Sequence, residues 1–559
     1  MFIRLQKSPT SKRIQVHLVE GYRNEKGQPR QRILKNYGEL SELSAQDPNI
    51  LEKLKAEAGR LTRQHKESRV MLEVDTLRAR NEGEHTLNYG HFFLESIYRG
   101  LRIPSFFRKE LKKKDFSYDL DAIMRLLVFS RVLMPDSKQA TFEAKDRFFC
   151  DFTFEKHDVY RALGVLAELC DELQLHMHKR ISQVYGREAR LVFYDVTNYY
   201  FETDLGDGFR EKGMSKEHRQ DPVVQMGLLI DAKGIPITFR LFSGNTHDSR
   251  TLIPVLKELK TKYGLARIVI VADKGLNSGA NLGYMENNSD GYIVSQKVRG
   301  SVAPEILRQI TDPDGYNWND NGKFAYKSFL RTVSHEKGKK TEEKVVCFWS
   351  SAHAARESHK RGDLLPAVED MLRHPGKYEA ANKYGRKRYV KEMLTTPEGE
   401  AAGKRLSFDE ERYQADAALD GYYCILTSEK EMDDLTIIEH YHGLSRIEES
   451  FRVIKSELEG RPVYVWTQSH IKAHFLICFI ALTLVRLIQM RSNYTISAKA
   501  LAKALNSAQC TPLEKGIFVV DETDTAYKAI ETAFGVSLTN RYAPIELIKA
   551  YRRQIMANS

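Results

Sequence analysis

The clearest hydrophobic pattern in the chain lies between Tyr441 and Phe479. In its first part, apolar residues recur every three or four positions, which predicts the buried face of an amphipathic helix. These residues are Ile447, Phe451, Ile454 and Leu458. Charged residues repeat at the same spacing one position later and are expected to border the buried face. They are Glu448, Arg452, Lys455 and Glu459.

Two adjacent glutamates in this helix are distinguished by their angular position. Glu448 lies beside the apolar stripe, where its side chain can lean into a cleft. Glu449 lies nearly opposite the stripe and is expected to point at water. The alternative interpretation is that all of these charges form a solvated helix flank.

The hydrophobic period changes at Ala189, where short apolar runs predict strands. The first run ends in Asp195, and a later one ends in Asp273. The predicted order is β-β-β-α-β-α-β, in which the second and third strands form a hairpin. The predicted strands are Leu191–Tyr194, Val223–Ile230, Ile235–Phe242, Arg267–Ala272 and 291–296, with helices up to about Tyr263 and over 279–287.

Asp195 and Asp273 are candidate metal ligands because active residues in open α/β sheets gather outside strand ends. Carboxylates that share one cleft are unfavourable unless they bind cations. Oxygen ligands without clustered Cys or His favour Mg²⁺ or Mn²⁺ over zinc. Each aspartate alone could instead be a cap or turn residue.

The first 40 residues predict a small, basic β unit. Up to Tyr37 there are nine Lys or Arg residues and two Glu residues, so this hairpin is a candidate DNA-contacting arm. A soluble cap on the next domain is the alternative. The candidate DNA contacts include Lys12, Arg13, Arg23, Arg30 and Arg32.

The net charge indicates the kind of binding partner to expect, and the cysteine pattern indicates the cellular compartment. The formal net charge is +11 and the pI is about 9.0, which favours nucleic acid, and next an acidic membrane, as a partner. The six cysteines are scattered, without a zinc or disulfide pattern, so a reducing cytoplasm is expected. The apolar run Phe475–Met490 is too short to span a bilayer and predicts a buried helix, so no membrane association is expected.

Six regions follow from these patterns. Residues 1–83 are a basic β hairpin with a helix, and 84–188 a helical domain, both interpreted as DNA-binding. Residues 189–299 and 431–495 form an α/β core, and 300–430 an insertion with strand-like runs and a polar helical stretch over 351–415. Residues 496–559 form a C-terminal region. Trp318 lies in an expected loop of the insertion, whereas Trp349 lies in an apolar strand.

Several of these segments together resemble the DDE-type transposases of bacterial insertion sequences, in the IS-four-like group and its IS-sixteen-thirty-four type. The resemblance is carried by FYDVTNYYFET (193–203), KGMSKEHRQDPVVQMGLLID (212–231), GIPITFRLFSGNTHDSRTL (234–252), IVIVADKGLNS (268–278), YHGLSRIEESFRVIKSELEGRPVYV (441–465) and the hairpin motif SKRIQVHLVEGYR (11–23).

This resemblance implies an RNase H-like catalytic core, a β-rich insertion before the glutamate helix and a mainly helical N-terminal domain. It implies that Asp195, Asp273 and Glu448 are the catalytic residues and hold Mg²⁺, for which Mn²⁺ can substitute. The expected reaction is metal-dependent cleavage of DNA strands at the element ends, followed by strand transfer into target DNA.

The family's Tyr-Arg-Glu-Lys signature selects Glu448 over Glu449, because Tyr441 lies seven residues before it and Lys455 seven after. The signature's arginine position is Leu444 here, and Arg452 is the expected replacement. Tyr441, Arg452 and Lys455 are therefore expected to contact DNA. The resemblance also implies that Trp318 stacks on a flipped base.

The implied partners are double-stranded DNA, with terminal inverted repeats and a target, and a second copy of the chain in a homodimer on DNA. A bacterial cytoplasmic protein, associated with the nucleoid when bound to DNA, is expected. Two alternatives stay open at this stage: a domesticated or inactive DNA-binding protein, and a metal-dependent nuclease without strand transfer.

Overall fold

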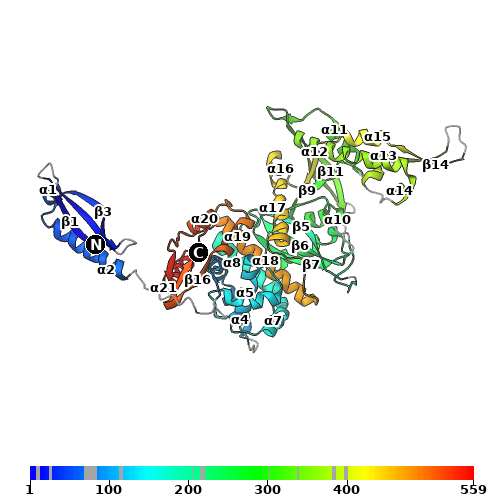
Figure 1. Cartoon of the computed structure of the whole chain (residues 1–559). Helices are drawn as coiled ribbons and strands as arrows, with labels where there is room; N and C mark the ends of the chain where they lie inside the picture. The colour runs from blue at the N-terminus through cyan, green and yellow to red at the C-terminus, as the bar shows by residue number, and fades with distance from the viewer. Residues whose placement is uncertain are drawn as a thin grey trace. The chain divides into compact units, whose positions relative to one another are not determined.

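The computed structural model describes residues 1–7, 13–23, 28–67, 85–112, 118–203, 205–213, 221–300, 302–336, 339–380, 385–395 and 401–558. The chain forms two compact units, Met1–Glu84 and His85–Ser559. Figure 1 shows both, coloured along the chain.

The smaller unit is a three-stranded antiparallel sheet followed by two helices. Its elements are β1 (Phe2–Lys7), β2 (Ile14–Arg23), β3 (Pro29–Glu39), α1 (Leu40–Gln46) and α2 (Ile50–Glu67). Val16 and Val19 of β2 and Leu54 and Ala58 of α2 form its buried core. The predicted hairpin is present as β2 and β3, and β1 adds a third strand that the sequence pattern did not predict.

The larger unit begins with a helical region that follows the short strand β4 (Leu87–Asn88), as the sequence predicts. Its helices are α3 (His91–Gly100), α4 (Ile103–Leu111), α5 (Leu120–Leu133), α6 (Lys138–Glu143), α7 (Lys156–Glu168) and α8 (Cys170–Tyr185). Of these, α3, α5, α7 and α8 pack on α18 (Gln468–Arg491), which belongs to a distant part of the chain.

Five strands and two helices follow in the predicted β-β-β-α-β-α-β order. Strands β5, β6 and β7 are antiparallel neighbours, β8 runs parallel to β5, and β9 runs parallel to β8. The spatial order β7-β6-β5-β8-β9 is that of an RNase H-like core. The elements are β5 (Leu191–Tyr200), β6 (Val223–Asp231), β7 (Pro236–Ser243), α9 (Leu252–Thr261), β8 (Val269–Ala272), α10 (Gly279–Asn287) and β9 (Gly291–Gln296).

The two faces of this sheet pack against different layers. Phe193 and Tyr199 of β5 belong to the core shared with α18 and the helical region. Val192, Tyr194 and Val196 of the same strand pack instead with α9 and α10. Because successive side chains alternate across a strand, residues 193, 195, 197 and 199 all lie on the α18 face.

The insertion is not a separate sheet. Strand β15 pairs with β9, so four insertion strands extend the core into one nine-stranded sheet. These are β10 (Asn317–Trp318), β11 (Phe324–Glu336), β12 (Lys339–Ser350) and β15 (Tyr422–Thr427), preceded by α11 (Pro304–Thr311). Hydrogen bonds between backbone segments far apart in the chain produce this arrangement, so the local hydrophobic pattern of the sequence does not predict it.

The stretch predicted as polar helix over 351–415 is only partly helical. It contains α12 (Ser351–Gly362), α13 (Leu365–Arg373), α14 (Pro375–Ala380) and α15 (Glu410–Ala417), but also the antiparallel strands β13 (Val390–Thr395) and β14 (Ala401–Phe408). Val390 and Tyr389 are buried against Val368 and Met371 of α13, so packing on a neighbouring helix stabilises the strand conformation there.

After the insertion come α16 (Asp434–His442), α17 (Ser445–Arg452), a π-helix (Val453–Glu457) and α18. Helix α18 is long and apolar enough to cross a bilayer, but 94% of its most apolar window is buried inside the protein. α18 is therefore longer than the predicted apolar run, and it is a buried core helix, as predicted. Figure 1 shows it between α5 and the sheet.

The C-terminal region packs on the helical region rather than forming a separate body. Strand β16 pairs with β4, and Tyr527 and Phe534 contact Phe93 of α3. Its elements are α19 (Ala498–Ser507), β16 (Gln509–Pro512), β17 (Ile517–Val520), α20 (Thr525–Phe534), β18 (Tyr542–Pro544) and α21 (Ile545–Ala557).

Candidate active site

Asp195 lies in β5, and Asp273, at the same level, directly follows the neighbouring parallel strand β8. The last hydrogen-bonded pair between β5 and β8 is Phe193 with Val271, and each aspartate comes two residues later. Alternation along β5 places Asp195 toward the α18 face, on which Phe193 and Val271 pack. Since neighbouring strands are about 4.8 Å apart, the two backbones are close.

The prediction that the first strand ends at Asp195 was wrong. β5 continues to Tyr200, and Asp195 pairs with Leu228 in the middle of it. The apolar run stops at Asp195, but the strand is held by β6 on its other side. Asp195 therefore lies in a regular strand, two residues past the last residue of β5 that pairs with β8.

Helix α17 is positioned against β5 by a close contact at Gly443. A Cβ atom there would lie 2.5 Å from Cζ of Phe193, so only glycine fits the observed approach. Further along, Nζ of Lys455 lies 5.5 Å from the centre of the Tyr199 ring. The helical segment therefore follows β5, and Glu448, which lies between Gly443 and Lys455, is near the level of Asp195.

Glu448 and Glu449 differ, but not as predicted. Glu448 is exposed at the sheet-facing edge of α17. Glu449 does not point freely at water: its carboxylate lies 3.3 Å from the guanidinium of Arg486, whose side chain is 4% exposed. The physical reason is that α17 packs on α18 as well as on the sheet, so a second side of the helix is covered. The four residues of the predicted apolar stripe are all buried.

Tyr441 is linked to Asp273 through Ser295, a buried residue of β9 that the sequence analysis did not single out. The Ser295 hydroxyl donates to Asp273 at 2.9 Å and shares a hydrogen bond with Tyr441. Burial, with the negative charges of Asp273 and Glu448, raises the pKa of Tyr441 to about 12. Tyr441 is therefore a protonated neighbour of both carboxylates at neutral pH.

The other residues of the signature lie along the same helix. Arg452 is exposed, 3.9 Å from Glu449, and Lys455 is half-buried within the π-helix. Short π segments often occur at functional sites. Leu444, at the signature's arginine position, packs against the core.

A cavity of about 400 Å³ opens beside Asp273. Tyr441, Tyr422, Tyr423 and His353 supply aromatic walls, and cationic side chains complete it. The cations are Lys274, Lys297 and Arg299. Aromatic rings and positive charges next to a carboxylate suit a nucleic-acid strand.

The arrangement offers oxygen ligands from three elements, as hard divalent cations prefer. In the described part of the chain, however, no three Asp, Glu, His or Cys side chains lie close enough together to hold one metal ion. The backbone brings the two aspartates and the glutamate helix to the end of β8, inside the nine-stranded sheet.

The predicted DNA contacts of the N-terminal unit lie in or beside its strands. Arg30 and Arg32 lie in β3, Arg23 is the last residue of β2, and Arg13 immediately precedes that strand. Arg32 pairs with Glu20 at 2.7 Å, and Arg13 lies 3.6 Å from Glu39. Lys12 lies outside the described residues.

Trp318 lies in the edge strand β10 and not in a loop, so that prediction was wrong. Its ring is more than half exposed, and its centre lies 5.5 Å from that of Trp349. Pairing with β11 fixes this short segment, which local sequence did not indicate. An exposed ring backed by a second ring can still accept a stacked base.

Comparison with known families gives two matches. The family described as "Transposase DDE domain" matches residues 186–484, and "IS1634 family transposase, N-terminal domain" matches residues 4–70. No curated protein matches the chain.

Two solved structures show distant likeness. One is the "Cryo-EM structure of piggyBac transposase synaptic complex with hairpin DNA (SNHP)", with 10% identity, a TM-score of 0.33, and 89% of this chain and 80% of that chain covered. The other is "Mos1 transposase paired-end complex with left transposon end", with 11% identity, a TM-score of 0.15, and 42% and 66% covered. Because the DDE domain spans more than half of the sequence, this protein belongs to the DDE transposase family, and its N-terminal domain makes it a transposase of the IS1634 type.

Proposed function

We propose that Asp195, Asp273 and Glu448 form the active site with which this DNA transposase cleaves its element ends and joins them to target DNA. One observation carries the assignment: Asp195 in β5 is level with Asp273, which directly follows the neighbouring parallel strand β8, and the helical segment that holds Glu448 follows β5. The alternative of a solvated helix flank does not account for the approach of this segment to β5, or for the charges of both Asp273 and Glu448 acting on Tyr441.

Mg²⁺ is the proposed cofactor, and Mn²⁺ should substitute for it, because all three side chains are oxygen ligands. When bound, the ions would activate the attacking oxygen and stabilise the leaving oxygen. Asp195, Asp273 and Glu448 would hold them. Ser295 and Tyr441 restrict the orientation of the Asp273 carboxylate through their shared hydrogen bonds.

The proposed DNA contacts come from three parts of the chain: the helical segment of Glu448, the insertion and the N-terminal unit. Lys455 and Arg452 would neutralise phosphates near the cleaved bond, and Trp318 would stack on an exposed base. In the N-terminal unit the basic residues would bind the terminal inverted repeats of the element. These are Lys12, Arg13, Arg23, Arg30 and Arg32.

Two copies of the chain would act together, because joining two element ends to one target requires two active sites. A bacterial cytoplasmic location is proposed, with the protein on the nucleoid when bound to DNA. All six cysteines are free, and five are buried, which supports a reducing compartment.

The test is strand cleavage and joining on DNA that carries the sequences flanking this gene, with Mg²⁺ present or chelated. The wild-type protein is compared with Asp195→Asn and Asp273→Asn. We expect metal-dependent cleavage and joined products from the wild type, and neither from the variants, while all three bind DNA. Cleavage without joined products would identify a nuclease, and binding without cleavage by the wild type would identify an inactive DNA-binding protein.

A further inference from the structure

A second cavity, of about 350 Å³, lies where the helical region meets the loop after the π-helix. Arg131 of α5 and Lys138 of α6 line it, with His474 of α18 and Arg461 of the loop. Arg131 is 5% exposed and Lys138 6%. The predicted active-site residues do not line this cavity.

The two buried cations lack a counter-charge from the described part of the chain. Arg131 donates to the carbonyl oxygens of Leu458, Glu459 and Asp136, and its Nε has no partner. No carboxylate of the described residues lies within 4 Å of either cation. Burial lowers the pKa of Lys138, because an unpaired buried charge is strongly unfavourable. An anion held between Lys138 and the permanently charged Arg131 would favour the charged lysine, so this arrangement fits a site for an anion.

His474 does not supply the missing charge. Its Nε2 lies 3.1 Å from the carbonyl oxygen of Gly460, which makes Nε2 the protonated nitrogen. Its Nδ1 then accepts from Lys138 at 3.5 Å, a long contact. Burial and the neighbouring cations hold the pKa of His474 well below its usual value. A neutral imidazole thus leaves Lys138 with one weak, uncharged partner.

We infer that this cavity binds a phosphate group, with Lys138 and Arg131 as the charged contacts. The cavity reaches the surface through the exposed residues Asp136, Glu459 and Tyr464. Asp136 accepts from the N–H of Ser137 at 2.5 Å, so one rim carboxylate is already engaged. The exposed Tyr464 ring at the rim can stack on a nucleotide base.

The cavity lies along the same strand as the proposed active site. Arg461, which lines it, lies 5.9 Å from the ring centre of Tyr200, at the far end of β5 from Leu191. Asp195 and Tyr200 are about 16 Å apart along the strand. That span equals roughly five base pairs of duplex DNA. We therefore favour a phosphate of bound DNA as the occupant of the cavity. This choice of source rests on the proposed function, whereas the inference that the cavity binds a phosphate group does not.

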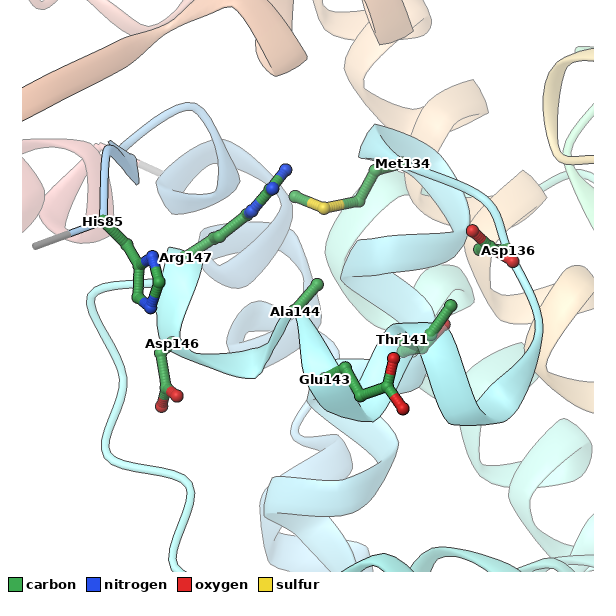
Figure 2. A pocket seen from close by; sticks show the side chains of 9 residues that line it. His85, Met134, Asp136, Thr141, Glu143, Ala144, Asp146 and Arg147 are labelled. Atoms are coloured by element: carbon green, nitrogen blue, oxygen red, sulfur yellow. The ribbon is translucent and has the colours of Figure 1, made fainter. Parts of the chain in front are cut away.

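The adjoining cavity has the opposite charge and serves as a contrast. It has a volume of about 340 Å³, shares Asp136, and is lined by Glu143 and Asp146 as well as by His85 and Arg147. Figure 2 shows these carboxylates on α6 and the segments on either side of it. Three carboxylates and one arginine line this cavity, whereas three cations and two carboxylates line the first, so the first is the better site for an anion.

The test uses the full-length protein and two probes, inorganic phosphate and duplex DNA carrying the flanking sequences. Lys138→Met removes the charge, Lys138→Arg keeps it, and Lys145→Met is the matched control. Lys145 is a half-buried lysine of the adjoining segment that lies outside the cavity. Thermal stability is measured in phosphate and in chloride of equal ionic strength, and DNA affinity as a function of salt.

We expect phosphate to raise the Tm of the wild type, Lys138→Arg and Lys145→Met, but not of Lys138→Met. If the source is DNA, the slope of log affinity against log salt falls by about 1 in Lys138→Met relative to Lys145→Met. An unchanged slope with a lost phosphate response would identify free phosphate as the occupant. Equal responses of Lys138→Met and Lys145→Met to both probes would overturn the inference. Lys138→Gln replaces Lys138→Met if the latter does not fold.

Discussion

The two sites proposed for the larger unit lie along β5 and differ in the charge of their main residues. At the carboxylate edge, the name used here for Asp195, Asp273 and Glu448 where β8 ends beside β5, the acids come from separate elements. In the cationic cavity, Arg131 and Lys138 are buried, and their hydrogen-bond partners among the described residues are carbonyl oxygens and the His474 ring. The first arrangement suits cations and the second an anion.

The largest difference should come from the neighbouring glutamates at the carboxylate edge. Glu448→Gln should reduce DNA cleavage by about 100-fold or more, the scale of losing a main electrostatic contribution to catalysis. Its thermal stability and DNA binding should stay near those of the wild type, because Glu448 is exposed. Cleavage and Tm are measured on the same preparations.

Glu449→Gln is the matched control. It should keep cleavage activity but lose about 1 kcal/mol of stability, because Arg486 loses a partly exposed counter-charge. Loss of cleavage in Glu449→Gln, with activity retained in Glu448→Gln, would reverse the assignment of the third carboxylate.

Gly443 tests whether the approach of α17 to β5 forms the carboxylate edge. Gly443→Ala places a Cβ 2.5 Å from Phe193 and should cost about 1–3 kcal/mol by overpacking. The displaced helix should also lower cleavage by about 10-fold or more. Gly164→Ala in α7 meets no atom within 4 Å and should stabilise the protein by about 0.5–1 kcal/mol. Full activity in Gly443→Ala would show that the contact does not position Glu448.

Lys138 in the cationic cavity should make the free energy of unfolding depend on pH. Burial, and next the charge of Arg131, lowers the pKa of Lys138 to about 7 from an ordinary value near 10.5. Between these values the unfolded chain binds the extra proton, so this group's contribution to the unfolding free energy rises with pH, by at most about 1.4 kcal/mol per unit. The groups around Lys138 are Arg131, Asp136, Glu459, Arg461, His474 and Cys478.

The measurement is the stability difference between wild type and Lys138→Met from pH 7 to pH 10, in buffer without phosphate. The wild type should gain stability relative to Lys138→Met as the pH rises, because methionine has no proton to lose on folding. Added phosphate should flatten the trend by favouring the charged lysine. A difference independent of pH would show that Lys138 keeps an ordinary pKa.

The smallest effect is expected at an exposed cation outside both sites. Arg30→Ala in β3 should lower DNA affinity modestly and the salt slope by about 1, with no change in thermal stability. Filter binding over a range of salt concentrations measures both quantities. An unchanged slope would remove Arg30 from the DNA contacts.

Several elements follow from sequence alone because their cause is local. The order of strands and helices from β5 to β9 is as predicted, and α10 and β9 have the predicted bounds. Period-two and period-3.6 hydrophobic patterns report the faces that strands and helices bury. The apolar stripe of α17 and the burial of α18 follow for the same reason.

Tertiary structure decided the rest. Asp195 lies within a strand because β6 continues to pair with it, and the insertion joins the core sheet because β15 pairs with β9. Glu449 is covered because α18 packs behind α17. Lys138 became notable only when α5, α6, α18 and a distant loop enclosed it. The sequence determined which segments bury one face, while contacts between segments far apart in the chain determined which charges meet, because such contacts leave no periodic signal.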